Sequence, residues 1–567
     1  MDYKEQYAFW CANAPAEYAP ALAAMKDDEQ ALKGGFGAEL AFGTAGIRGI
    51  MGLGCNRLNE FTVRRTAQGL ARWLTGAELP QRCAIGYDSR HNSRLYAEIC
   101  AAALADAGVH VYVYHELAPT PMLSFAVRQL DCGCGIVVSA SHNAGIYNGI
   151  KCYGPDGCQM TDAPAAVVFD EIGRIPYFTP GKQSFAEHLD QGHVEYIAPE
   201  VWEAYYQAVL AQGLCPQAVA EAGLRVLYTP LCGTGNKPVR EIFRRIGVKA
   251  EVVACQEQPD GDFKTCEYPN PETDAALNES YRIAEKTHPD LIVGTDPDCD
   301  RVAVAVPHNG AFRKLSGNEL GCVLLDYILR KRTEKGDLPD GAACVKSIVS
   351  TPMADRIAAY YGCEMKNVLT GFKYIGGEIL RLEQAGQLER FVFGFEESCG
   401  YLKGTYARDK DAVVASMLVC EAAADAKARG MDLVDALDAL YARFGCYAAY
   451  VQSVELQGIT AAEVSKEFMA NIRAHTPEQI GGCAVTATAD YLASERKDTA
   501  AGTCSPIDLP KSNVFTMELG EQGKIIVRPS GTEPKIKLYY TAVGKTWEQA
   551  NALLDSFRKG MAGFLPG

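Results

Sequence analysis

The sequence predicts an α/β protein made of several domains. Its 567 residues are enough for three or four domains at about 150 residues each. Short apolar runs typical of buried strands alternate with longer stretches of helical periodicity along most of the chain. Several of these runs, including residues 136–138 and 289–295, end in polar turns. Such strand ends are where α/β folds hold their functional groups.

The elements follow in a regular order. Residues 7–33 have a helical pattern and precede the first predicted strand-and-helix unit, and further units follow after residue 199. The predicted strands are residues 83–86, 109–114, 136–138, 224–228, 289–295, 343–348 and 391–393, and the predicted helices are residues 61–74, 95–107, 199–210, 318–330 and 352–361.

The last part of the chain has a different pattern. From about Cys446 it alternates polar and apolar residues, then continues as a helix over residues 461–475, and ends in strands over residues 524–527 and 536–541. Strands grouped in this way favour an α+β unit.

Composition excludes several classes of partner. A net charge of −15 disfavours nucleic acids and anionic membranes. No apolar run approaches the roughly 18 residues of a membrane span, and the first residues lack a signal-peptide pattern, so we expect a cytoplasmic protein.

The 21 cysteines are odd in number and contain no Cys-x-x-Cys pair, which indicates reduced, buried thiols rather than a zinc site.

A polar turn with reactive groups follows residues 136–138. It contains Ser141 and His142, and Lys151 lies ten positions beyond the serine. A serine with an imidazole beside it and an ammonium group nearby could act as a nucleophile with proton-transfer and charge-stabilising partners. For an isolated Ser-His pair, a simple polar turn is the competing interpretation.

A second turn carries three carboxylates at alternating positions, Asp296, Asp298 and Asp300, followed by Arg301. Their mutual repulsion requires a neutralising cation, and oxygen ligands favour Mg²⁺. An EF-hand does not fit, because its sixth and twelfth positions would be Arg301 and Pro307. A phosphatase of the haloacid-dehalogenase type does not fit either, because Asp300 replaces the expected Thr or Val. An acidic surface turn is the remaining alternative.

Further polar loops recur along the chain. They are Phe-Gly-Thr-Ala-Gly-Ile-Arg-Gly at 42–49, Asp-Ser-Arg at 88–90, Thr-Gly-Phe-Lys-Tyr-Ile at 370–375, Gly-Phe-Glu-Glu-Ser-Cys-Gly at 394–400, Arg-Asp-Lys-Asp at 408–411 and Arg-Pro-Ser-Gly-Thr-Glu-Pro-Lys at 528–535. Asp88 and Arg90 could form an ion pair that braces the serine loop, or a weak surface pair. The last loop, with Arg, Ser, Gly and Thr, is a plausible phosphate cradle.

In this order the loops resemble those of the α-D-phosphohexomutases, and most closely the phosphoglucomutase-2-like branch. The family's serine loop usually reads Thr-Ala-Ser-His-Asn-Pro, so Ser139 and Ala144 are departures that leave the reactive groups in place. The resemblance implies three related mixed α/β domains and a C-terminal α+β domain around one central cleft. We expect a phosphoserine domain with an N-terminal extension over residues 1–198, a metal-binding domain over 199–310, a sugar-binding domain over 311–445 and a phosphate-binding domain over 446–567.

The resemblance also implies roles for individual residues. Ser141 would carry the phosphoryl group, and Mg²⁺ would bind Ser141, Asp296, Asp298 and Asp300. The implied catalytic residues are Ser141, His142, Arg48, Lys151 and Lys410, and the implied substrate-binding residues are Thr44, Arg301, Lys373, Glu396, Ser398, Arg528, Ser530, Gly531 and Thr532.

The implied reaction interconverts glucose 1-phosphate and glucose 6-phosphate, with glucose 1,6-bisphosphate as intermediate and activator. Phosphopentomutase, phosphomannomutase, bisphosphate synthase or phosphatase activity and a non-catalytic sugar-phosphate sensor are the alternatives. The sequence does not decide whether His142, Lys151 or Lys410 is the general acid or base. We expect a sugar phosphate as the partner and a monomer or small homo-oligomer.

Overall fold

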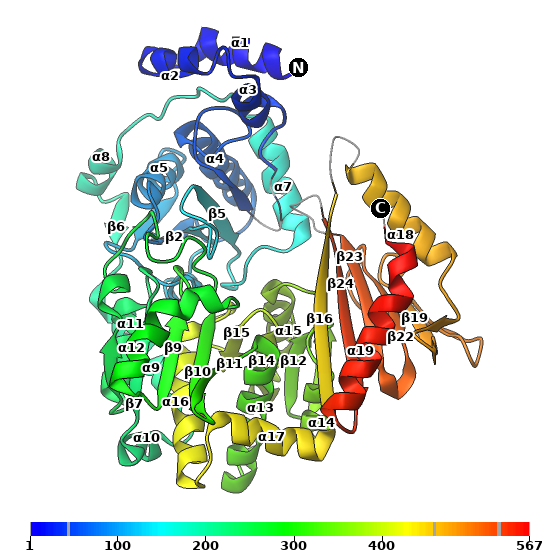
Figure 1. Cartoon of the computed structure of the whole chain (residues 1–567). Coiled ribbons are helices and arrows are strands. Elements are labelled where there is room, and N and C mark those ends of the chain that lie inside the picture. The colour runs from blue at the N-terminus through cyan, green and yellow to red at the C-terminus, as the bar shows by residue number, and fades with distance from the viewer. Residues whose placement is uncertain (1, 42, 44–45, 457–460, 530–534, 566–567) are drawn as a thin grey trace.

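The computed structural model describes the whole chain except residues 1, 42, 44–45, 457–460, 530–534 and 566–567. Three α/β units form the main body, and a fourth unit stands beside them (Figure 1). The expected fold class, three mixed α/β units followed by an α+β unit, is therefore confirmed.

The N-terminal helical region is broken into three helices that lie at one end of the molecule (Figure 1). Proline fixes the backbone and lacks an N–H group, and Pro15 lies between the first two helices. Trp10 is fully buried and packs edge-on against Phe36 and Phe61, so the extension is fastened to the first unit. The helices are α1 (Tyr3–Asn13), α2 (Ala19–Ala24) and α3 (Glu29–Phe36).

The first unit is a six-stranded mixed sheet with the strand order β1-β5-β4-β2-β3-β6. Its central strand β4 (Cys134–Val138) is buried along its whole length, as its apolar sequence predicts. The other strands are β1 (Gly46–Ile50), β2 (Arg82–Tyr87), β3 (His110–Val113), β5 (Tyr147–Tyr153) and β6 (Val194–Tyr196), and the helices are α4 (Glu60–Gly76), α5 (Ser93–Ala105), α6 (Thr120–Gln129), α7 (Asp162–Gly173) and α8 (Phe185–Asp190).

The second unit is a five-stranded sheet with the order β11-β10-β9-β7-β8. Its last hairpin extends to Leu315, beyond the boundary expected at residue 310, because β10 and β11 pair in antiparallel fashion through a tight turn. The strands are β7 (Arg225–Thr229), β8 (Lys249–Val252), β9 (Leu291–Thr295), β10 (Val302–His308) and β11 (Ala311–Leu315), and the helices are α9 (Pro199–Leu210), α10 (Pro216–Ala222), α11 (Asn236–Arg245) and α12 (Asn278–Thr287).

The third unit is a four-stranded sheet with the order β13-β12-β14-β15. Its helix α16 (Ala412–Ala428) is apolar on nearly all sides and packs against helices of both the second and third units, which therefore share one core. The strands are β12 (Ala343–Ser347), β13 (Glu364–Val368), β14 (Phe391–Glu396) and β15 (Gly400–Lys403), and the other helices are α13 (Gly317–Lys335), α14 (Met353–Tyr360), α15 (Phe372–Gln384) and α17 (Leu433–Phe444).

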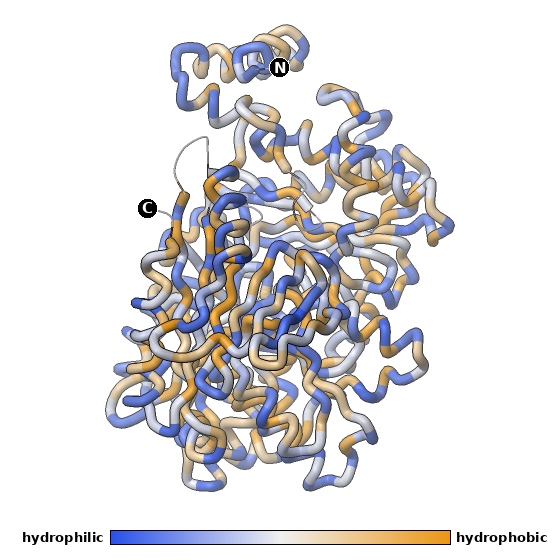
Figure 2. Tube along the Cα trace, turned by 90° about the vertical axis from the view of Figure 1, so that its right-hand side faces the viewer, coloured by the Kyte–Doolittle hydropathy of each residue, from blue (hydrophilic) through white to orange (hydrophobic). Residues whose placement is uncertain are grey.

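The fourth unit is an antiparallel seven-stranded sheet, covered by α18 (Ala461–Ala474) and α19 (Trp547–Met561) and built around a core of its own. Figure 2 shows hydrophobic and hydrophilic stretches alternating along the trace throughout the body. The strands in sheet order are β16 (Cys446–Glu455), β24 (Lys535–Gly544), β23 (Gly523–Pro529), β22 (Phe515–Glu518), β19 (Ala487–Asp490), β20 (Glu495–Asp498) and β21 (Cys504–Pro506), with β17 (Gln479–Ile480) and β18 (Cys483–Ala484) as a separate pair.

Most cysteines are buried free thiols, as the sequence predicts, and Cys11, Cys255 and Cys504 are the exposed ones. Within the described residues, no helix combines the length and the apolar character that a membrane span requires.

Candidate active site

The serine loop connects β4 to β5 and is held by an arginine from the end of β2. Ser141 is nearly fully buried and has a backbone φ of 51°. Residues other than glycine rarely adopt this left-handed backbone conformation unless their surroundings enforce it. Arg90 donates to the carbonyl oxygens of Ser141 at 2.6 Å, Ala144 at 2.8 Å and Tyr147 at 3.0 Å. The loop conformation is therefore imposed by its surroundings.

Asp88 holds Arg90 in turn. The Arg90 Nε lies 3.2 Å from Asp88 Oδ2, and both side chains are fully buried. The guanidinium also stacks on the ring of Phe263 from the second unit, 4.9 Å from its centroid. The expected ion pair is confirmed as a buried brace of the serine loop rather than a surface pair.

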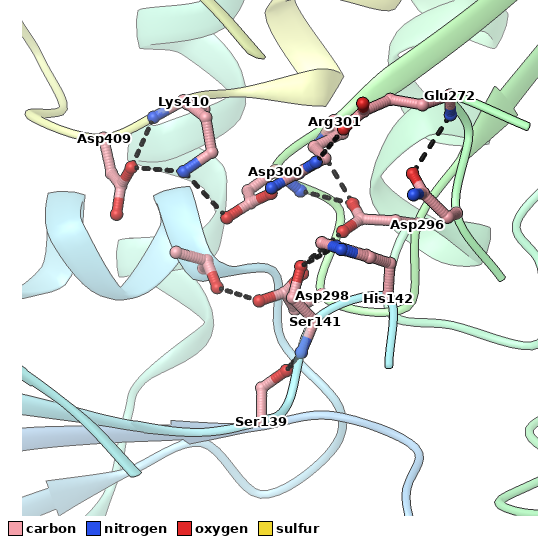
Figure 3. A network of polar contacts seen from close by, with 12 residues as sticks. Ser139, Ser141, His142, Glu272, Asp296, Asp298, Asp300, Arg301, Asp409 and Lys410 are labelled. Atoms are coloured by element: carbon pink, nitrogen blue, oxygen red, sulfur yellow. Dashed lines mark hydrogen bonds and ion pairs between the residues drawn. The ribbon is translucent and has the colours of Figure 1, made fainter. Parts of the chain in front are cut away.

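The hydroxyl of Ser141 has two polar neighbours (Figure 3). It donates to Asp296 Oδ2 at 2.9 Å, and His142 Nδ1 lies 3.1 Å from Oγ. Burial, together with the positive charges of Arg301 and Arg48, lowers the pKa of His142 well below its ordinary value. A neutral imidazole can therefore exchange a proton with the serine.

The acidic loop follows β9 and faces the serine loop. The carboxylates of Asp296, Asp298 and Asp300 are buried, and oxygens from all three lie within 4.8 Å of one another. Asp296 Oδ1 accepts the backbone N–H groups of residues 300 and 301, each at 3.0 Å, which curls the loop around that carboxylate. Thr120 of the first unit donates its hydroxyl to Asp298 Oδ2 at 3.1 Å. The two units are thus joined at the acidic loop.

These carboxylates fit a divalent cation. The Oδ1 atoms of Asp298 and Asp300 are buried and have no hydrogen-bond partner within the described part of the chain. Buried oxygens without a partner are costly unless an ion or water satisfies them, and hard oxygen ligands suit Mg²⁺. Burial and the two neighbouring carboxylates also raise the pKa of Asp296 well above its ordinary value. The donor set and its excess negative charge favour a magnesium site.

Two lysines converge on this cluster. Lys151 Nζ lies 2.6 Å from Asp298 Oδ2 and 3.3 Å from Asp300 Oδ2, and Lys410 Nζ lies 3.0 Å from the same Asp300 oxygen. Burial alone would raise the pKa of Asp298 and of Asp300, but the two ammonium groups hold both below the ordinary value. Both lysines are therefore positioned as fixed positive charges beside the acidic loop.

Two arginines complete the cationic side. Arg48 on β1 donates to the side-chain oxygen of Asn143 at 3.2 Å, so it reaches the serine loop. Arg301 is tied by an ion pair to Glu272, which lies in the segment before α12 (Figure 3). Both arginines lie near enough to lower the pKa of His142.

The third unit carries the residues predicted to bind the sugar. Glu396 at the end of β14 accepts the backbone N–H of Gly371 at 2.6 Å, and burial, followed by repulsion from Glu397, raises its pKa to about 7. Lys373 at the start of α15 pairs with Asp162 of the first unit at 2.5 Å. Ser398 is half-buried in the turn after Glu396. These groups stand at the carboxyl end of β14 and the adjoining loop.

The fourth unit places Arg528, half-buried, near the end of β23, where it pairs in register with Lys537 of β24. Four predicted substrate-binding residues, Thr44, Ser530, Gly531 and Thr532, lie outside the described residues. The phosphate cradle therefore stays a prediction.

Four sequence-family models match successive parts of the chain and together cover most of it. They are described as phosphoglucomutase/phosphomannomutase alpha/beta/alpha domain I over residues 39–176, domain II over 203–310 and domain III over 316–444, and as the C-terminal domain over 511–559. The chain belongs to the phosphoglucomutase/phosphomannomutase family. It is accordingly a phosphotransferring isomerase.

Relatives and solved structures agree with this assignment. The chain is 37% identical over 515 residues to a phosphoglucomutase of Staphylococcus aureus (strain bovine RF122 / ET3-1), covering 89% of this chain and 90% of the relative. It is 38% identical over 516 residues to a phosphoglucomutase of Staphylococcus epidermidis, with 89% and 91% coverage. The fold resembles parafusin, a phosphoglucomutase from Paramecium in an open form, with a TM-score of 0.68, 18% identity and 93% and 96% coverage. A putative phosphomannomutase from Thermus thermophilus gives a TM-score of 0.66 at 23% identity, with 92% and 99% coverage.

Within this phosphohexomutase site, sequence reasoning missed several contributors. Glu272, Asp409 and Thr120 touch Arg301, Lys410 and Asp298, respectively. Glu272 and Thr120 stand in no pattern that distinguishes them from ordinary polar residues, and Asp409 lies in the Arg-Asp-Lys-Asp loop without a role that the sequence could assign.

The turn at residues 231–235, between β7 and α11, also shapes the site. A side chain at Gly233 would come within 2.4 Å of the Pro297 backbone, so only glycine lets this turn approach the acidic loop.

Proposed function

We propose that the chain is a phosphoglucomutase that interconverts glucose 1-phosphate and glucose 6-phosphate through phospho-Ser141 and glucose 1,6-bisphosphate. The supporting observation is the contact between Ser141 Oγ and Asp296 at 2.9 Å, which joins the predicted nucleophile to a buried three-carboxylate cluster. The phosphoglucomutase relatives, at 37% and 38% identity, support glucose as the sugar.

The reaction has two matching half-cycles. In the first, the bond between phosphorus and Ser141 Oγ breaks while a bond forms from phosphorus to the free sugar hydroxyl. The sugar hydroxyl loses a proton, and Ser141 Oγ gains one. His142 Nδ1 lies 3.1 Å from Oγ, so the neutral imidazole could relay this proton, giving one at Nδ1 while its other ring nitrogen takes one from the sugar side. In the second half-cycle, the other phosphate of the bisphosphate returns to Ser141 by the reverse steps.

Positive charge around the transfer position comes from several residues. Lys151 and Lys410 stand beside the carboxylates and so face the phosphoryl group carried by Ser141, with Arg48 and Arg301 on the same side. Preorganised charges of this kind stabilise the transferring phosphoryl group without reorganisation of solvent. Burial would lower the pKa of both lysines, but the neighbouring carboxylates hold it above the ordinary value, so both act as charges rather than as bases.

Mg²⁺ would be held by Asp296, Asp298 and Asp300 and by an oxygen of phosphorylated Ser141. When bound, the ion neutralises negative charge on the transferring phosphoryl group. Within the described residues, Lys151 pairs with Asp298 and Asp300, and Lys410 and Arg301 pair with Asp300, so positive charge already lies on one side of the cluster.

The sugar and its second phosphate would occupy groups from the third and fourth units. Glu396 and Ser398 suit adjacent hydroxyls, since a carboxylate accepts and a hydroxyl both accepts and donates. Lys373 lies at the same end of the third sheet. Arg528, with Ser530, Gly531 and Thr532, would hold the phosphate that is not reacting.

A coupled assay tests this function. Glucose 1-phosphate should be converted to glucose 6-phosphate, and added glucose 1,6-bisphosphate should raise the rate by phosphorylating Ser141. Mannose 1-phosphate and ribose 1-phosphate are compared under identical conditions. Faster turnover of either would identify a phosphomannomutase or a phosphopentomutase, and net accumulation of bisphosphate or free phosphate would identify a synthase or a phosphatase. The cytoplasmic location and the monomeric or small oligomeric state remain predictions.

A further inference from the structure

One strand of the first unit supports both lysines of the transfer centre. Lys151 and Tyr153 are two residues apart on β5 and therefore point to the same face. Lys151 reaches the acidic loop directly, whereas the hydroxyl of Tyr153 donates to Asp409 Oδ2 at 2.7 Å. Asp409 belongs to the segment between β15 and α16, in the third unit.

Asp409 divides its two carboxylate oxygens between two partners. Oδ2 accepts from Tyr153, while Oδ1 accepts both the backbone N–H of Lys410, at 2.8 Å, and its Nζ, at 3.0 Å. The ammonium group of Lys410 therefore lies between Asp409 Oδ1 and Asp300 Oδ2, at 3.0 Å from each. The position of Lys410 thus depends on a carboxylate that is itself anchored in another unit.

The preceding residue fastens the same segment a second time. Arg408 is fully buried, and its backbone N–H donates to Ser124 Oγ of the first unit at 2.8 Å. Its guanidinium pairs with Glu383 at 2.9 Å, and Glu383 also pairs with Arg128 of the first unit at 2.8 Å. Residues 408 to 410 are consequently held to the first unit on both sides, and Tyr153 is the contact nearest to Lys410.

Charge balance explains why such an anchor is needed. Lys151 and Lys410 both approach Asp300 Oδ2, at 3.3 and 3.0 Å, so their ammonium groups repel each other. Asp409 supplies Lys410 with a second negative neighbour, and the bond from Tyr153 keeps that carboxylate in place. Without this support, Lys410 would be free to move away from Asp300.

We propose that Tyr153 and Asp409 are positioning residues that fix Lys410 against Asp300 and thereby against the phosphoryl group being transferred. The proposal rests on the function proposed above. It assigns Tyr153 a role through its hydroxyl group only, since the ring is part of the buried core.

The test compares Tyr153→Phe, Asp409→Asn and the double variant with the wild type. A buried hydrogen bond to a charged group contributes about ten- to hundredfold, so kcat should fall by about that factor in Tyr153→Phe while KM for glucose 1-phosphate stays within about twofold. Because both residues act through one contact, the double variant should be no slower than Asp409→Asn. If the factors by which the two single substitutions lower kcat multiply in the double variant, the proposal is overturned.

Tyr327→Phe is the matched control. Tyr327 is a buried tyrosine that donates to a carboxylate, Glu421, at 3.0 Å, between α13 and α16 and away from the transfer centre. Its substitution should lower thermal stability about as much as Tyr153→Phe does and leave kcat unchanged. A loss of kcat in this control equal to that of Tyr153→Phe would reduce the effect to general destabilisation and overturn the proposal.

A second measurement does not depend on the substrate. The protein is treated with acetic anhydride, and peptide mass spectrometry measures the extent of acetylation at Lys410 relative to that at Lys151. This ratio should rise severalfold in Tyr153→Phe and Asp409→Asn but not in Tyr327→Phe. Unchanged labelling of Lys410, or unchanged kcat in Tyr153→Phe, would overturn the positioning role. If the wild type fails to convert glucose 1-phosphate while the labelling shift is seen, the proposed function fails and the positioning role stands.

Discussion

Two regions of the molecule carry the charged side chains that the proposed reaction uses. One is the centre shared by the first three units, and the other is the edge of the C-terminal sheet formed by its strand ends, where the inner strand β23 stops. In the centre, Asp296 and Asp298 are fully buried, and the exposed fraction of each lysine side chain is 12%. At the edge of the C-terminal sheet, Arg528 is half-buried on β23 beside Lys537 of β24.

The difference follows from what each region does. Removing one member of a buried ion pair leaves the other charge unpaired and costs about 3 to 5 kcal/mol, so the central groups keep a fixed geometry. A half-buried cation stays partly solvated and can exchange its partner at little cost. Fixed charges suit phosphoryl transfer at one serine, and exchangeable ones suit a phosphate that must be bound and released in every cycle. Substitutions should therefore act on turnover in the centre and on substrate binding at the edge.

The largest effect is expected for Ser141→Ala, which removes the group that carries the phosphoryl. Turnover should fall by at least about a thousandfold, and intact-mass measurement should show one phosphoryl group on the wild type and none on the variant. Ser184→Ala, at the N-terminus of α8, removes a surface hydroxyl and serves as the control. Full activity in Ser141→Ala would show that the centre is not the site of transfer.

Asp298→Asn should have the next largest effect. Loss of a charged ligand should weaken Mg²⁺ binding, measured by calorimetry, and lower turnover by about a hundredfold or more. Asp435→Asn alters a second carboxylate cluster, formed with His308 and Asp432, and should leave the Mg²⁺ dependence unchanged. Equal sensitivity to magnesium removal in both variants would contradict the assignment of the metal to the central cluster.

Glu396→Gln addresses the sugar side and its pH dependence. The pKa of Glu396 is raised to about 7 by burial and by Glu397, so its carboxylate is protonated below that pH and ionised above it. If the ionised form accepts the sugar hydroxyls, kcat/KM should rise with pH through about 7 in the wild type and stay flat in the variant. Side-by-side rates on glucose, mannose and ribose 1-phosphates should also change in ratio. Unchanged ratios and an unchanged profile would remove Glu396 from the sugar site.

Ionisation of Glu396 should affect stability in the direction opposite to its effect on activity. Because the folded-state pKa lies above the unfolded value of 4.5, the folded protein binds the proton more tightly, and ionisation of Glu396 opposes folding. Between pH 4.5 and 7, the stability of the wild type should therefore fall relative to that of Glu396→Gln, as measured by urea unfolding at several pH values.

The smallest effect is expected for Arg528→Ala at the edge of the C-terminal sheet. Loss of a charge-assisted contact of roughly 1.5 to 3 kcal/mol should impair the forward and reverse reactions alike by about ten- to hundredfold in kcat/KM. More glucose 1,6-bisphosphate should also escape before it has turned around, as detected by its release during steady-state turnover. A variant defective with only one of the two monophosphates would indicate separate phosphate sites.

Local sequence patterns predicted many elements closely. The helix over residues 199–210 is observed with the same bounds, and the strand over 343–348 differs by one residue from β12. Such patterns succeed because the period of apolar residues reports which face of an element is buried. The uninterrupted N-terminal helical pattern fails at Pro15. The boundary at residue 310 stays a prediction: the matched domain II ends there, while β11 beyond it still pairs with β10 of the second sheet.

The sequence by itself determined the reactive groups and the turns that display them, because a serine, three alternating carboxylates and their flanking apolar strands are local features. Only the tertiary structure decided which charges meet. Tyr153 and Asp409 are separated by 256 positions, and Ser141 and Asp296 by 155, yet each pair shares a hydrogen bond. No local pattern encodes these pairs, because packing of the three units, rather than the spacing along the chain, sets the distance between their partners.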